Sequence, residues 1–98
     1  MIFFLTYHAL TNINHPDYGQ IKGAYINCWI EAKNLEEAKI KSRKTIESLK
    51  WGIVSLDMAY PKNISDYNNE SEGKEFHEQA LIDKEMYQIH TYPETDSL

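Results

Sequence analysis

The sequence predicts a small α+β domain, a two-layer sandwich in which helices cover one face of a four-stranded sheet. Three observations support this fold class. Residues 34–49 have the spacing of an amphipathic helix, four segments have strand composition, and 98 residues with 42% hydrophobic content suffice for one core. The predicted order β-β-α-β-α-β favours a permuted, ferredoxin-like packing. Residues 1–93 form one predicted domain, and residues 94–98 a C-terminal tail.

The first helix is the best-defined element of the sequence. Asn34 can cap its first turn, and Glu37, three residues later, completes a capping-box pattern. Lys50 is expected to close the last turn, and Gly52 to leave the helix at positive φ. The side chains at helical spacing, which predict the buried stripe, are Leu35, Ala38, Ser42, Thr45, Ile46 and Leu49.

The two strands before this helix differ in pattern. Residues 2–10 are apolar on both faces, which is typical of a central strand. A turn-rich loop over residues 11–23 follows. Residues 24–32 alternate cleanly. The inward set is Ala24, Ile26, Cys28, Ile30 and Ala32, and the outward set is Tyr25, Asn27, Trp29 and Glu31.

The remaining elements follow the first helix. Residues 51–60 predict a third strand, and residues 86–92 a fourth. The first two strands are expected to be an antiparallel pair and the first helix to make a right-handed crossover, with the order of the strands in the sheet left open. Residues 72–82 predict a short second helix capped by Ser71, with Phe76, Ala80 and Leu81 inward. The third strand is expected to present one apolar face made of Val54, Leu56, Met58 and Tyr60.

Such a sandwich leaves one sheet face without helices. The side chains expected there are Thr6, His8, Tyr25, Asn27, Trp29, Glu31, Ser55, Asp57, Gln88, His90 and Tyr92. The face could bind a second copy of the chain, hold a small ligand, or be covered by the 11–23 loop and the tail. The candidate interface or ligand residues are His8, Tyr25, Asn27, Trp29, Asp57, His90 and Tyr92, with Trp29 at the centre of a dimer contact.

Charge and composition narrow the functional classes. A net charge of −5, with the acidic residues concentrated after residue 56, argues against nucleic acid as a partner. No stretch is long and apolar enough for a membrane span, so no membrane partner is expected. The single Cys28 excludes an intrachain disulfide and favours a cytoplasmic location.

The sequence contains no motif that points to catalysis. The four histidines lack zinc-ligand spacing, and Cys28, between Ile26 and Ile30, is expected to be buried and inert. No metal, cofactor or catalytic residue is therefore predicted. The favoured function is a non-catalytic protein-interaction module that forms a homodimer, with a further protein partner left open. The alternatives are a small-ligand-binding or enzymatic domain around His8, His90 and Asp57, and an acidic inhibitor that mimics a polyanion.

Overall fold

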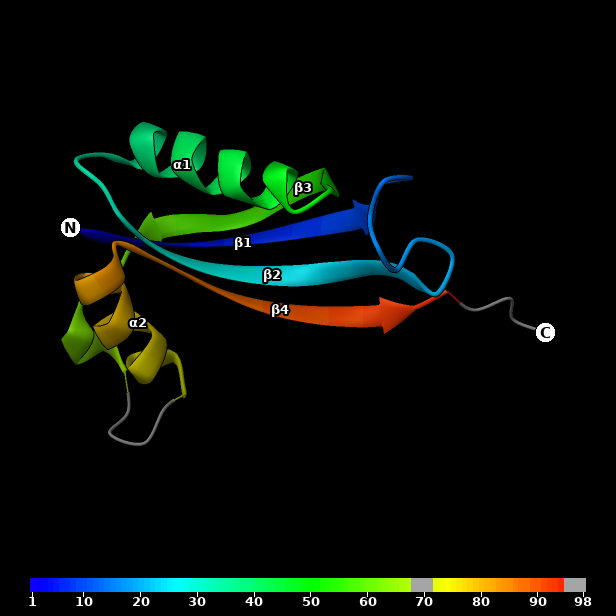
Figure 1. Cartoon of the computed structure of the whole chain (residues 1–98). Helices are drawn as coiled ribbons and strands as arrows, with labels where there is room; N and C mark the ends of the chain where they lie inside the picture. The colour runs from blue at the N-terminus through cyan, green and yellow to red at the C-terminus, as the bar shows by residue number, and fades with distance from the viewer. Residues whose placement is uncertain (68–71, 95–98) are drawn as a thin grey trace.

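The structure, a computed structural model, describes residues 1–67 and 72–94 (Figure 1). It confirms an α+β fold with one four-stranded sheet and two helices. Ser71 and residues 95–98 of the expected tail lie outside the described residues. The elements are β1 (Ile2–Thr11), β2 (Ile21–Glu31), α1 (Leu35–Ser48), β3 (Trp51–Pro61), a 3-10 turn η1 (Ile64–Asp66), α2 (Glu72–Asp83) and β4 (Glu85–Pro93).

The sheet has the strand order β3-β1-β2-β4, and every neighbouring pair is antiparallel. The central pair, β1 and β2, forms the antiparallel pair expected for the first two strands. The loop between them is shorter than the expected residues 11–23, because β2 begins at Ile21. β3 and β4 are the two edges. The ferredoxin-like arrangement expected from the sequence is not confirmed.

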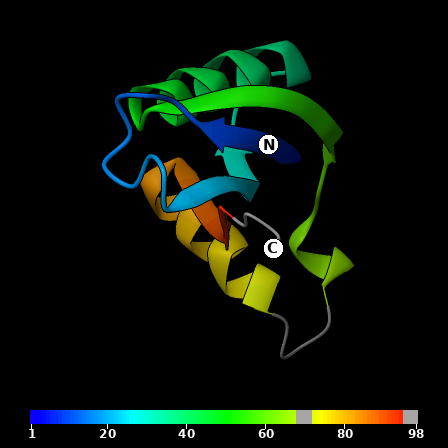
Figure 2. The ribbon, with the colours of Figure 1, turned by 90° about the vertical axis from the view of Figure 1, so that its right-hand side faces the viewer.

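The two helices lie on opposite faces of the sheet, so the expectation that both cover one face is wrong (Figures 1 and 2). α1 packs with Leu5, Ile26 and Ile30, whereas α2 packs through Ala80 on Ile2 and Trp29. The reason is that the outward side of β1 and β2 is also strongly apolar at one end. The chain between the two edge strands buries that end by crossing the second face.

The first helix begins as the sequence predicts and ends differently. The Asn34 Oδ1 accepts a hydrogen bond from the Glu37 backbone N–H at 2.9 Å, which confirms the cap. The helix ends at Ser48, and Lys50, at φ 70°, takes the left-handed conformation that Gly52 was expected to supply. Leu49 is consequently the C-cap and exposed, so its expected place in the buried stripe is wrong.

Two register shifts interrupt the pairing of β1 with β3, leaving Val54 and Asp57 without a partner. Each bulge inserts one residue and therefore reverses the side-chain alternation. Leu56 pairs with Tyr7 on the α1 face, while Met58 and Tyr60 pair with residues of the opposite face. The single apolar face expected for this strand is therefore wrong.

Candidate functional site

The sheet face opposite α1 has a covered half and an uncovered half. In the covered half, Trp29 is only 2% exposed. Its ring stacks on Phe76 of α2, with the centroids 4.9 Å apart, and lies 5.2 Å from the Phe4 ring. The Trp29 Nε1–H donates to the Tyr67 hydroxyl at 2.9 Å. Trp29 thus fills a core between the sheet and α2, and its expected role as an accessible interface residue is wrong.

The covered half also contains a chain of hydrogen bonds from Trp29 through Tyr67 to His77, which sequence reasoning missed. The Tyr67 hydroxyl lies 3.0 Å from Nδ1 of His77, which is itself buried. Burial, followed by the nearby Lys62, lowers the pKa of His77. The Lys62 ammonium lies 4.5 Å from the Tyr67 ring centroid. An isolated tyrosine in a polar segment was the only sequence signal for this packing.

The uncovered half is organised around an aromatic stack from three strands. The His8 and Tyr25 rings lie nearly parallel, with their centroids 4.7 Å apart. The His8 Nε2 and the Tyr92 hydroxyl are 2.6 Å apart, and the Tyr25 and Tyr92 centroids 5.6 Å. Three of the candidates expected from the sequence are therefore in mutual contact.

Gly23 makes this stack possible. A Cβ added at Gly23 would lie 2.5 Å from the Tyr92 hydroxyl and 2.5 Å from the backbone oxygen of Ala9. Because β2 has no side chain at this point, Tyr92 of β4 can reach across it to His8 of β1. The close approach therefore requires glycine.

The other candidates occupy different parts of the face. The Asn27 Nδ2–H donates to Gln88 Oε1 at 3.0 Å, and the Gln88 amide in turn donates to Glu72 at the start of α2. His90 pairs with Tyr25 and is exposed. Asp57, displaced by its bulge, accepts a hydrogen bond from the Ser55 hydroxyl at 2.8 Å. Asp57 and His90 lie on opposite edge strands of the sheet. The polar cluster expected from His8, His90 and Asp57 is therefore not formed.

The uncovered half carries no formal charge among its paired strand residues. Among the described residues, carboxylates stand at its borders: Glu72 meets Gln88, Asp57 meets Ser55, and Glu94 lies near Tyr92. Tyr25, at the middle, is 53% exposed. The strand residues that share this surface, which we call the neutral face, are Thr6, His8, Leu10, Tyr25, Asn27, Ser55, Met58, Gln88, His90 and Tyr92.

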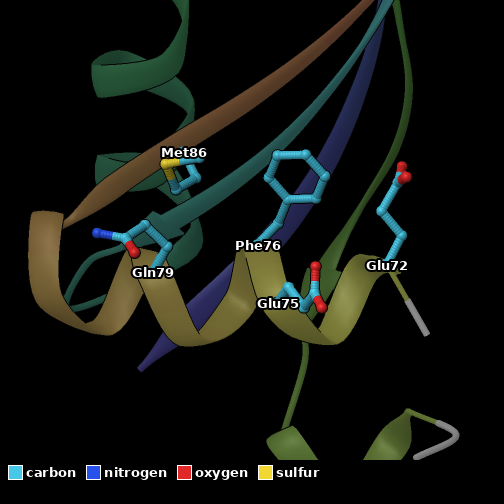
Figure 3. A pocket seen from close by; sticks show the side chains of 5 residues that line it. All are labelled: Glu72, Glu75, Phe76, Gln79 and Met86. Carbon is cyan, nitrogen blue, oxygen red and sulfur yellow. The ribbon is translucent and has the colours of Figure 1, made fainter. Parts of the chain in front are cut away.

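A separate hollow of about 310 Å³ lies between α2 and β4 (Figure 3). Phe76 and Met86 give it an apolar wall, and Glu72, Glu75 and Gln79 give it polar edges. No sequence pattern predicted this hollow, because its walls come from α2 and β4, and α2 was expected on the other face of the sheet. Its chemistry suits an apolar group beside a positive charge.

Two kinds of reactive group bear on catalysis among the described residues: the single cysteine and any cluster of metal-binding side chains. Cys28 is fully buried against α1, and burial raises the pKa of its thiol, so the reactive thiolate is disfavoured. Within residues 1–67 and 72–94, no group of three or more His, Cys, Asp and Glu side chains could hold a metal ion.

Comparison with known proteins adds no assignment: no protein-family model, curated protein or solved structure matches the chain at a significant level. Neither helix in the described part of the chain has the length and apolar character needed to cross a membrane.

Proposed function

We propose that this chain is a non-catalytic protein-interaction module that self-associates through the neutral face. The observation that carries the proposal is an uncharged, aromatic surface on a chain with a net charge of −5. Charged side chains are typically depleted, and aromatic ones enriched, at the centre of protein interfaces. The centre of the contact is Tyr25, in place of the buried Trp29.

The neutral face is the surface through which two copies can meet with little repulsion. Contacts through other surfaces would bring the negative charges of two acidic chains together. Contact through this surface keeps the carboxylates of both copies at the border, where water screens them. The His8–Tyr25–Tyr92 stack is held by packing and by the His8–Tyr92 hydrogen bond. Association therefore requires little additional ordering of these side chains.

The covered half sets the direction of approach. α2 stands on one end of the sheet (Figure 1). A second copy must therefore dock over the other end of this face, where Tyr25 and Met58 are exposed. The sequence-based alternative of a ligand site around His8, His90 and Asp57 has less support, because Asp57 and His90 lie on opposite edges.

The test compares two tyrosines of equal exposure. Tyr25→Arg places a charge in the middle of the neutral face, whereas Tyr18→Arg alters a tyrosine that is 55% exposed outside it. We expect Tyr25→Arg to weaken association through the neutral face at least 30-fold, by about 2 kcal/mol as for a central aromatic anchor, and Tyr18→Arg to leave it unchanged. Sedimentation velocity over a concentration series measures both. Equal behaviour of the two variants, or a wild-type protein that stays monomeric at high micromolar concentration, would contradict the proposal.

A salt series separates this proposal from the polyanion-mimic alternative. Binding driven by the acidic second half of the chain should weaken steeply as salt rises, because its charges are exposed and screened. Association through the neutral face should change little over the same range.

A further inference from the structure

The two edges of the sheet differ in regularity. β3 carries two bulges, a device that typically prevents an edge strand from pairing with another chain. β4 pairs with β2 without interruption from Glu85 to Tyr92 and forms the other outer edge (Figure 1). Its outer side therefore presents an uninterrupted row of backbone groups.

The backbone geometry identifies which residues of β4 face outward. The Glu31 N–H donates to the Lys84 carbonyl at 2.8 Å, and Glu31 and Lys84 lie opposite each other in the register that pairs Ile30 with Glu85. Hydrogen-bonded and non-hydrogen-bonded pairs alternate along an antiparallel ladder. Tyr87, Ile89 and Thr91 therefore belong to non-hydrogen-bonded pairs, and their N–H and C=O groups point away from β2. No other backbone hydrogen bond among the described residues reaches these three.

We propose that β4 pairs with β4 of a second copy in antiparallel order, centred on Ile89. In this register Ile89, which is 38% exposed, faces Ile89 of the second copy. Tyr87 faces Thr91 of the second copy, and each of these residues both donates and accepts a backbone hydrogen bond. The two sheets join into one continuous sheet.

The charged residues at the two ends of β4 favour a second copy as the partner and favour this antiparallel register. Lys84 precedes β4 and Glu94 follows it, and both are exposed. The Glu94 N–H donates to the Gln20 carbonyl at 2.9 Å, so Glu94 stays beside the sheet. Antiparallel pairing about Ile89 places Lys84 opposite Glu94 of the second copy, and Glu94 opposite its Lys84. Parallel pairing would set like charges side by side.

This contact goes beyond the proposed function and does not depend on it. The neutral face associates through side chains on one side of the sheet, while β4 associates through backbone groups at its edge. Pairing at the edge also brings the neutral faces of two copies into one plane, which doubles the surface available to a partner.

The first experiment uses Tyr25→Arg as the background, so that contact through the neutral face is removed. Ile89→Pro takes away the central outward N–H and leaves the ladder with β2 intact, because proline is tolerated where the N–H faces solvent. Ile89→Ala is the matched control, since it removes the same side chain and keeps the N–H. Sedimentation should show an assembly larger than a dimer for the wild type, because both contacts are present, and a dimer for the background and for Ile89→Ala. Ile89→Pro in the background should be a folded monomer. A monomeric background would overturn the edge pairing while leaving the neutral-face proposal supported.

A charge exchange tests the register without proline. Lys84→Glu and Glu94→Lys should each weaken the edge dimer roughly tenfold, because two exposed ion pairs become like-charge pairs. The double variant should recover the original affinity. Dimers unaffected by either single change, or not restored by the double change, would overturn the proposed pairing. If the background dimer forms but an extended peptide of the β4 sequence fails to compete with it, the edge is likewise excluded.

Discussion

Truncating Trp29 should cost much more stability than any other single change on the α2 side of the sheet. The side chain is 2% exposed, stacks on Phe76 and packs against Phe4. Removing a fully buried tryptophan typically costs about 3–5 kcal/mol, the cavity included. Trp29→Ala also leaves the Tyr67 hydroxyl without its donor, which adds about 1 kcal/mol. We therefore expect Trp29→Ala to lower the free energy of unfolding by an amount at the upper end of this range. Trp29→Phe keeps a ring and should lower it by about 1–2 kcal/mol.

Two measurements check this prediction. Urea denaturation followed by far-ultraviolet circular dichroism gives the free energy of unfolding, and Trp51, buried on the α1 face, remains as a separate fluorescence reporter. Hydrogen exchange should show α2 losing protection before α1, since Trp29 is the largest side chain that α2 covers. A cost below about 1 kcal/mol, or unchanged exchange in α2, would refute the packing described for the second face.

The other predictions concern both sides of the sheet. Asn34→Ala should lower the free energy of unfolding by about 1 kcal/mol in urea titrations, because the cap is lost, while Asn34→Asp should retain it. Ile46→Ala should cost about 2–5 kcal/mol from the α1 core, whereas Leu49→Ala, on the exposed C-cap, should cost under about 0.5 kcal/mol; similar costs would disprove the helix orientation. His77 has a folded-state pKa below its ordinary value of 6.5, so the unfolded chain binds the proton first and stability falls as pH drops below 6.5. His77→Gln should flatten this dependence in thermal melts, and an unchanged slope would exclude His77 as its source.

Local patterns predicted the start of α1 and the inward face of β2. Asn34 and Glu37 are close in sequence, so their capping contact depends on one turn of helix alone. The alternation around Cys28 likewise predicted its burial, because period-two spacing assigns a face directly. Signals of this kind need no knowledge of the rest of the fold.

Errors arose where long-range packing decides the outcome. Nothing in the residues of β3 marks Val54 and Asp57 as bulged, because a bulge depends on how β1 pairs with the strand. The apolar stripe of α2 indicates which side of the helix is buried. It does not indicate which face of the sheet the helix packs on. Trp29 was consequently placed on an open surface, although α2 covers it.

The sequence predicted which residues lie on the uncovered half of the site and did not predict the contacts among them. Its members follow from the alternation of β1, β2 and β4, so His8, Tyr25 and Tyr92 could be assigned to one face from sequence. Their contact could not, because it depends on the strand order and on the reach of Tyr92 across Gly23.

Gly23 also bears on how β4 finds its alignment. A slip of one residue would turn every β4 side chain to the wrong face, so the apolar pattern excludes it. A slip of two residues keeps all faces correct, and the pattern alone allows it. Gly23 removes that freedom, because a shift by two residues would bring Tyr92 opposite Tyr25 or opposite Ile21, and both of these residues carry a side chain. One absent side chain thus distinguishes the native alignment from the nearest mispaired one, and it also fixes where Lys84 and Glu94 stand along the edge.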